Sequence, residues 1–138
     1  MSIYLHNRYD STPYLVDVEY NRNGIESKRV NINGTVSSRG VLPDIIVHKR
    51  VDGNIYDGEE NNLLVIEMKK KTNHEVLKDH HKLKGFTSDL GVSYNGRQYI
   101  YNYTLGVFIR FGNTLEESEI IFYRAGEMDR DNIWDIWF

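Results

Sequence analysis

The 138-residue chain contains no cysteine. It can therefore form neither a disulfide framework nor a thiolate zinc site, and it is compatible with a reducing compartment. It also lacks the roughly 18 consecutive apolar residues of a transmembrane helix and the basic and apolar regions of a signal peptide. We expect a soluble, cytoplasmic protein that does not bind membranes.

An excess of positive charge is missing too. The formal net charge of -3 argues against a protein that holds nucleic acid through global positive charge. The charge is unevenly distributed, because residues 67–84 contain six lysines, whereas residues 113–138 contain seven acidic residues and two arginines. A phosphate ligand is therefore expected near the first of these segments.

The length of the chain predicts one domain spanning residues 1–138. Apolar periodicity and turn residues predict a helical turn or two at 2–8, strands at 14–20, 41–48 and 63–71, a helix at 71–86 capped by Asn73, and strands at 99–111 and 120–124. The short polar link between the second and third strands predicts that they pair antiparallel. This order indicates an α/β protein with a mixed β-sheet and a first helix that is short or absent.

The second and third strands carry three ionisable residues, Asp44, Glu67 and Lys69. Because side chains alternate along a strand, Glu67 and Lys69 share one face, and Asp44 shares a face with His48. If the strands pair, the two carboxylates and the ammonium meet at one end of the sheet. Buried strand ends rarely carry such groups without a partner or a purpose. The sequence therefore predicts a metal site, with a surface ion-pair group as the alternative.

Pro43-Asp44 on one strand, followed by Glu67-Met68-Lys69 at the end of the next, resembles the motif of the PD-(D/E)XK nuclease superfamily. The stretches 17–22, 43–48 and 63–70 also resemble small uncharacterised bacterial members of that superfamily. The resemblance covers about residues 17–112. It implies a restriction-endonuclease-like αβββαβ core with a central mixed sheet.

The resemblance also implies a function: a Mg²⁺-dependent endo- or exonuclease acting on DNA, with Mn²⁺ as a possible substitute. Asp44, Glu67 and the backbone carbonyl of Met68 would be the metal ligands, and Lys69 the catalytic lysine. Members often place a further glutamate on the first helix, and here barely a helix precedes Pro13. The alternative is therefore a catalytically inactive nucleic-acid-binding or assembly module that retains the fold.

Further residues are candidates for supporting roles. Contacts to the nucleic-acid backbone are expected, with ordinary solvation as the alternative, for Arg22, Lys70, Lys71, Lys78 and Lys82. Glu19 and His48 are candidates for positions beside the metal ligands; the alternatives are a structural ion pair for Glu19 and a partly exposed strand histidine for His48. His80 and His81 are adjacent on a helix and are not expected to face one metal. The aromatic residues 133–138 are expected to dock on the core or to form a homodimer interface.

Overall fold

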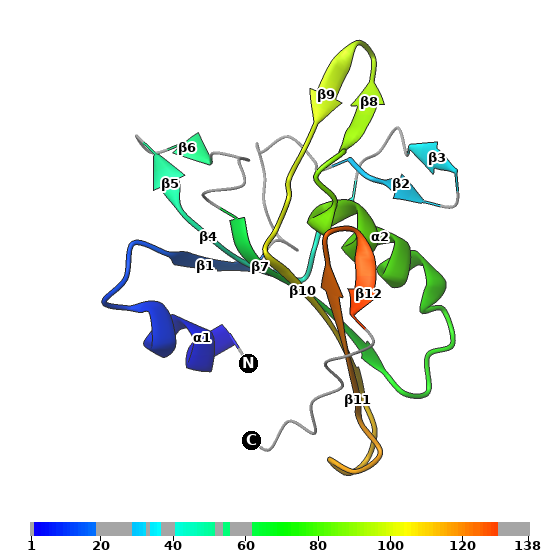
Figure 1. Ribbon diagram of the computed structural model, residues 1–138. Coiled ribbons are helices and arrows are strands. Elements are labelled where there is room, and N and C mark those ends of the chain that lie inside the picture. Colours follow the sequence, from blue (N-terminus) through cyan, green and yellow to red (C-terminus); the bar gives the residue numbers. More distant parts are fainter. Residues whose placement is uncertain are drawn as a thin grey trace.

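A computed structural model describes residues 2–18, 29–32, 34–36, 41–51, 54–55 and 62–129. The described chain forms a six-stranded sheet and two helices (Figure 1). The helices are α1 (Ser2–Tyr9) and α2 (Leu77–Thr87). The sheet contains, in spatial order, β1 (Leu15–Val18), β4 (Ile45–His48), β7 (Asn62–Lys70), β10 (Leu105–Phe111), β11 (Glu119–Arg124) and β12 (Glu127–Asp129). Two-stranded ribbons are formed by β2 (Asn31–Ile32) with β3 (Thr35–Val36), β5 (Arg50–Val51) with β6 (Asn54–Ile55), and β8 (Val92–Tyr94) with β9 (Arg97–Tyr99).

The central sheet is mixed. Strand β4 runs antiparallel to both β1 and β7, so the predicted antiparallel pairing of β4 with β7 is confirmed. Strand β10 is parallel to β7, and a parallel pair needs a crossover, which contains α2. The predicted mixed α/β class is confirmed.

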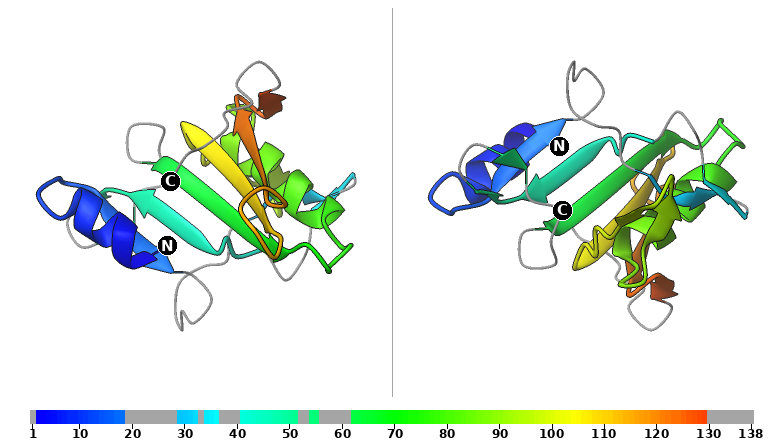
Figure 2. Two further views of the ribbon diagram at one scale, coloured as in Figure 1. Left: turned by 90° about the horizontal axis from the view of Figure 1, so that it is seen from below. Right: turned by 90° about the horizontal axis from the view of Figure 1, so that it is seen from above.

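The two helices cover opposite faces of this sheet (Figure 2). Leu5 of α1 packs in one buried cluster with Ile45 and Ile66, whereas Leu83 of α2 packs in the other with Ile46. Consecutive residues of a strand point to opposite faces, so a strand buried on both sides reads as a continuous apolar run. The predicted short first helix is also confirmed, because α1 has eight residues. Neither α1 nor α2 is long and apolar enough to cross a membrane.

Helix α2 begins later than predicted. The side chain of Asn73 does not cap it, because Asn73 Oδ1 accepts a hydrogen bond from the Glu75 N–H at 2.9 Å and the N-cap residue is Val76. A short amide side chain that bonds to the backbone two residues ahead stabilises a turn in competition with the helix. The prediction that Asn73 caps a helix starting at residue 71 was wrong.

The strand predicted at 99–111 starts only at Leu105. Residues 97–99 instead belong to the hairpin of β8 and β9, which projects from the sheet in Figure 1. Its two turn residues, Asn95 and Gly96, have φ angles of 50° and 76°. Two consecutive positive φ angles at an Asn-Gly pair are typical of the tight turn that joins antiparallel strands.

Candidate functional site

Asp44 and Glu67 lie side by side where β4 begins. Ile45 is opposite Ile66 in the antiparallel pair, so Asp44 and Glu67 occupy the next pair of facing positions. Both belong to the face of the sheet that α2 covers, because they alternate with Ile45 and Ile66 on the α1 side. Asp44 Oδ2 also accepts a hydrogen bond of 2.7 Å from the Met68 N–H. The structure thus brings together the two carboxylates that the sequence singled out.

The backbone of Met68 faces the same place. Its N–H reaches Asp44, and the N–H and C=O of one residue in an extended strand point to the same side. The Met68 carbonyl therefore points to the side of β7 on which β4 begins. The Met68 side chain packs on the opposite face, in the cluster under α1. Met68 can contribute only a backbone oxygen to this site.

Glu67 is buried against a lysine of α2. Its side chain is almost inaccessible, and Lys82 Nζ lies 2.7 Å from Glu67 Oε1. Burial raises the pKa of Glu67 from 4.5 to about 8, although the charge of Lys82 opposes the shift; the nearby charges of Asp44 and Asp79 raise it further. Lys82, expected to contact nucleic acid or to be solvated, is itself 7% exposed and lies inside the site.

Asp79 connects this pair to Lys69. Asp79 is buried on the first turn of α2, its Oδ1 is 3.8 Å from Lys82 Nζ, and its Oδ2 is 3.4 Å from Lys69 Nζ. The charges therefore alternate along the series Glu67, Lys82, Asp79, Lys69. Sequence reasoning missed Asp79. The sequence spacing could have identified it, because residues 79, 82, 83 and 86 follow the helical repeat and therefore share the inner face of the helix.

The site opens to solvent on one side. The Lys69 side chain is 29% exposed and Asp44 is partly exposed, whereas Glu67, Asp79 and Lys82 are buried. A ligand would therefore approach past Lys69 and Asp44. Lys82 reaches Glu67 from α2, which covers this face of the sheet.

The oxygen atoms at this opening suit a hard cation. Two carboxylates and a backbone carbonyl are the donors that Mg²⁺ and Mn²⁺ accept. Glu67 Oε1 is buried and receives no well-oriented hydrogen bond from the described chain, although it is ion-paired. Among all the residues that the structure describes, no three His, Asp or Glu side chains lie close enough together to hold a metal. The Met68 carbonyl or water would have to complete the coordination.

His48 lies at the far end of β4 from Asp44. It is fully buried, and its Nε2 pairs with a carboxylate oxygen of Asp17 on β1. The expectation of a partly exposed histidine was wrong, because the face of β4 that carries His48 is covered by core residues. Its neighbour is Asp17 and not the Asp44 carboxylate.

The remaining candidate residues lie around the site or outside the described chain. Lys70, Lys71 and Lys78 are exposed, and Lys71 Nζ donates a hydrogen bond of 3.0 Å to the Glu117 carbonyl. His80 and His81 point in different directions, since His80 contacts the Tyr123 hydroxyl and His81 lines the outer side of α2. Glu19, Arg22 and residues 133–138 lie outside the described residues.

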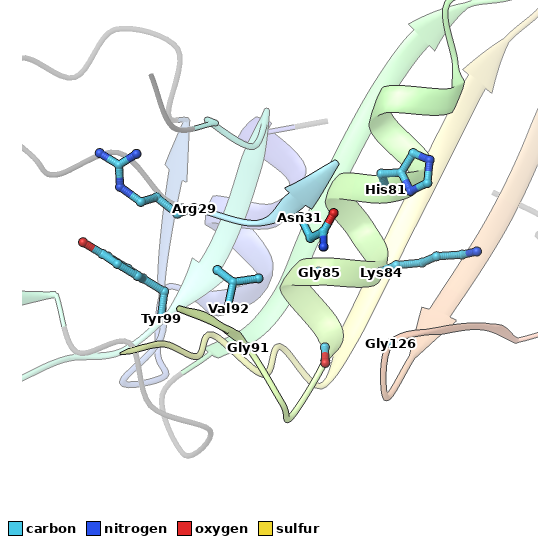
Figure 3. Close-up of a pocket in the computed structure, with 10 residues that line it drawn as sticks. Arg29, Asn31, His81, Lys84, Gly85, Gly91, Val92, Tyr99 and Gly126 are labelled. Atoms are coloured by element: carbon cyan, nitrogen blue, oxygen red, sulfur yellow. The ribbon is translucent and has the colours of Figure 1, made fainter. Parts of the chain in front are cut away.

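A pocket of about 260 Å³ lies elsewhere, beside the outer side of α2 (Figure 3). It is lined by Arg29, Asn31, His81, Lys84, Gly85, Ser88, Gly91, Val92, Tyr99 and Gly126. None of the predicted site residues is among them. Figure 3 shows the Lys84 side chain pointing away from Arg29, so the cationic groups of this pocket do not converge on one ligand position.

Comparison of the chain with protein-family models, with curated proteins and with solved structures finds no significant match. The function must therefore be argued from the geometry of Asp44, Glu67 and their neighbours.

Proposed function

We propose that this chain is a metal-dependent nuclease with a restriction-endonuclease-like fold, hydrolysing phosphodiester bonds in DNA. The observation that carries the proposal is the facing placement of Asp44 and Glu67, with the Met68 backbone bonded to Asp44. The element order supports it: α1, three antiparallel strands, α2, and then β10 parallel to β7. This is the order that an αβββαβ core requires.

The residues divide into those that would bind the metal and one that would contact the phosphate. Asp44, Glu67 and the Met68 carbonyl would hold Mg²⁺, or Mn²⁺ in its place, through hard oxygen atoms. The ion would supply activation of a water molecule and neutralisation of charge at the phosphate. Lys69 is more exposed than Lys82, so its ammonium is the one placed to contact a phosphate or orient the attacking water.

The proposal extends to partners and location. The exposed lysines Lys70, Lys71 and Lys78 would contact the DNA backbone beside the site. A reducing, cytoplasmic location accords with the lack of cysteine. The aromatic residues 133–138 would form the interface of a homodimer.

The test is DNA cleavage with added Mg²⁺ or Mn²⁺, paired with calorimetric measurement of metal binding. We expect metal-dependent cleavage by the natural chain and a loss of about 10³-fold in Asp44→Asn, Glu67→Gln and Lys69→Ala. Lys84→Ala is the control, because it removes an exposed lysine of α2 that lines the separate pocket and has no role in the proposed site, and it should retain activity within about fivefold. Absence of both metal binding and cleavage, or cleavage that survives Lys69→Ala, contradicts the proposal.

A second candidate, a nucleic-acid-binding or assembly module without catalysis, is favoured by two observations. Helix α1 contains no acidic residue that could supply a further ligand, and the Glu67 carboxylate is already paired with Lys82. Such a module would bind DNA in a salt-dependent manner. That binding would persist in EDTA and in Glu67→Ala.

A further inference from the structure

Lys82 and Asp79 are charged groups of the site to which the proposed reaction gives no role. The Lys82 ammonium is buried, lies on the inner side of α2 and is 2.7 Å from Glu67 Oε1. Lys69, which the sequence motif singles out, is instead nearest to Asp79, at 3.4 Å. The lysine that touches the metal-binding carboxylate is therefore supplied by the helix and not by the strand.

We propose that Lys82 is a positioning residue that competes with the metal for Glu67 and shifts to Asp79 when the metal binds. This inference rests on the proposed function, because it assumes that Glu67 is a metal ligand. It assigns to Lys82 and Asp79 the control of how tightly the site holds a divalent cation.

The geometry provides two neighbouring positions for the ammonium. Lys82 Nζ is 2.7 Å from Glu67 Oε1 and 3.8 Å from Asp79 Oδ1. Asp79 lies one turn before Lys82 on the same helix, so the lysine can approach it by side-chain rotation without movement of α2. In the second position the ammonium remains paired, which avoids an isolated charge in a buried place.

The sign of the effect follows from electrostatics. A divalent cation on Glu67 and an ammonium at the same oxygen repel each other, and the repulsion is strong because Glu67 and Lys82 are buried. Removing the Lys82 charge should therefore tighten metal binding. Removing the Asp79 charge should weaken it, because Lys82 then has no second carboxylate to approach.

The experiment measures the Kd for Mn²⁺ of the full chain at one fixed pH, by the electron paramagnetic resonance signal of free Mn²⁺. We expect Lys82→Met to lower Kd by at least about tenfold. Lys84→Met is the matched control, since it removes the same charge from an exposed position of the same helix, and should change Kd by less than about threefold. Lys82→Gln keeps a hydrogen-bond donor to Glu67 and should also lower Kd. It replaces Lys82→Met in the test if the Met variant folds poorly.

The role of Asp79 is tested by a double-mutant cycle. Asp79→Asn should raise Kd in the natural chain, and this rise should shrink in the Lys82→Met background, because the lysine that needs Asp79 is gone. A purely structural role of Asp79, or a simple field effect of its charge, would give the same fold-change in both backgrounds. An equal change therefore overturns the proposed shift to Asp79.

The outcomes separate this inference from the proposed function. If Mn²⁺ binds and requires Asp44 and Glu67, but Lys82→Met and Lys82→Gln match Lys84→Met, competition by Lys82 is overturned and the metal site stands. If no variant binds Mn²⁺, the metal site itself is overturned, and the competition with it. If Lys82→Met binds Mn²⁺ more tightly than the natural chain, the competition is supported.

Discussion

Glu67 is the residue whose protonation depends most on the fold. It sits at the end of a strand with an apolar core beneath it and α2 above it, and burial raises its pKa to about 8. The nearby Lys82 only partly offsets this shift. A carboxyl group with this pKa is largely protonated at neutral pH in the metal-free protein, and such a shifted pKa is typical of functional sites.

At the residue scale, we predict that the stability of the metal-free protein falls as pH rises from 4.5 to about 8. The folded protein binds the Glu67 proton more tightly than the unfolded chain does, because the pKa of Glu67 is raised from 4.5 to about 8. The stabilisation that protonation of Glu67 contributes is therefore fully present below pH 4.5 and is lost as pH rises to about 8. Urea unfolding in EDTA at several pH values measures this fall.

The comparison with Glu67→Gln isolates the contribution of Glu67. Glutamine does not titrate, so the variant should gain stability relative to the natural chain as pH rises through this range. Comparing the two proteins is necessary because His80 also changes stability with pH. Burial lowers the pKa of His80, so its contribution to stability changes with pH in the opposite direction below pH 6.5. Glu116→Gln, at an exposed position, should leave the profile unchanged. Parallel profiles for Glu67→Gln and the natural chain would contradict the prediction.

Among the elements, α2 connects the core to the site. Its Leu83 and Phe86 are buried in the hydrophobic cluster, and the same side of the helix carries Asp79 and Lys82 toward Glu67. Farther along α2, Gly85 lies against Val30. The close approach at Gly85 fixes where the segment before β2 crosses the helix.

At the element scale, we predict that Gly85→Ala destabilises the protein by about 1–3 kcal/mol. This is the opposite of the usual effect, because alanine is normally more favourable than glycine within a helix by about 1 kcal/mol. A Cβ atom at Gly85 would lie 2.5 Å from Val30 Cβ, a buried atom of the core. Denaturant unfolding measures the change. Lys84→Ala, at the preceding exposed position, should stay within about 0.5 kcal/mol. A stabilising Gly85→Ala would show that α2 and residue 30 do not meet in this way.

Across the whole molecule, cationic and acidic residues are separated along the chain. The lysine-rich stretch 67–84 covers the end of β7 and most of α2, which surround the site, whereas residues 113–138 contain seven acidic residues and two arginines. Anionic DNA should therefore approach the end of the sheet that carries Lys69 and Lys70.

For the assembly, we predict that the full chain sediments as a dimer at micromolar concentration. Aromatic side chains give large contact areas at protein interfaces, and residues 133–138 contain Trp134, Trp137 and Phe138. A variant with Trp134→Ser and Trp137→Ser should sediment as a monomer. Tyr4→Ser, at another exposed aromatic position, is the control and should remain dimeric. A natural chain that is monomeric throughout would exclude this interface.

The sequence by itself determined the class of the fold and the pair of carboxylates. Continuous apolar runs specify strands buried on both faces, and the two-residue period of a strand places Asp44 and Glu67 on one face once β4 and β7 pair. The sequence was insufficient to predict the bounds of elements where local hydrogen bonds or turns compete with the regular helix or strand. The Asn73 turn shortened α2 at its start, and the Asn95-Gly96 turn drew Tyr99 into a hairpin with residues 92–94, although a continuous strand was predicted at 99–111.

Only the tertiary structure decided which lysine meets which carboxylate. Lys69 and Lys82 look alike in sequence, since each carries one positive charge at the edge of an apolar segment. Their partners depend on how α2 lies across β7, which directs Lys82 to Glu67 and Lys69 to Asp79. Long side chains from separate elements meet according to packing, which no local pattern records. The burial that raises the pKa of Glu67 has the same origin, because it exists only when the sheet and α2 are assembled.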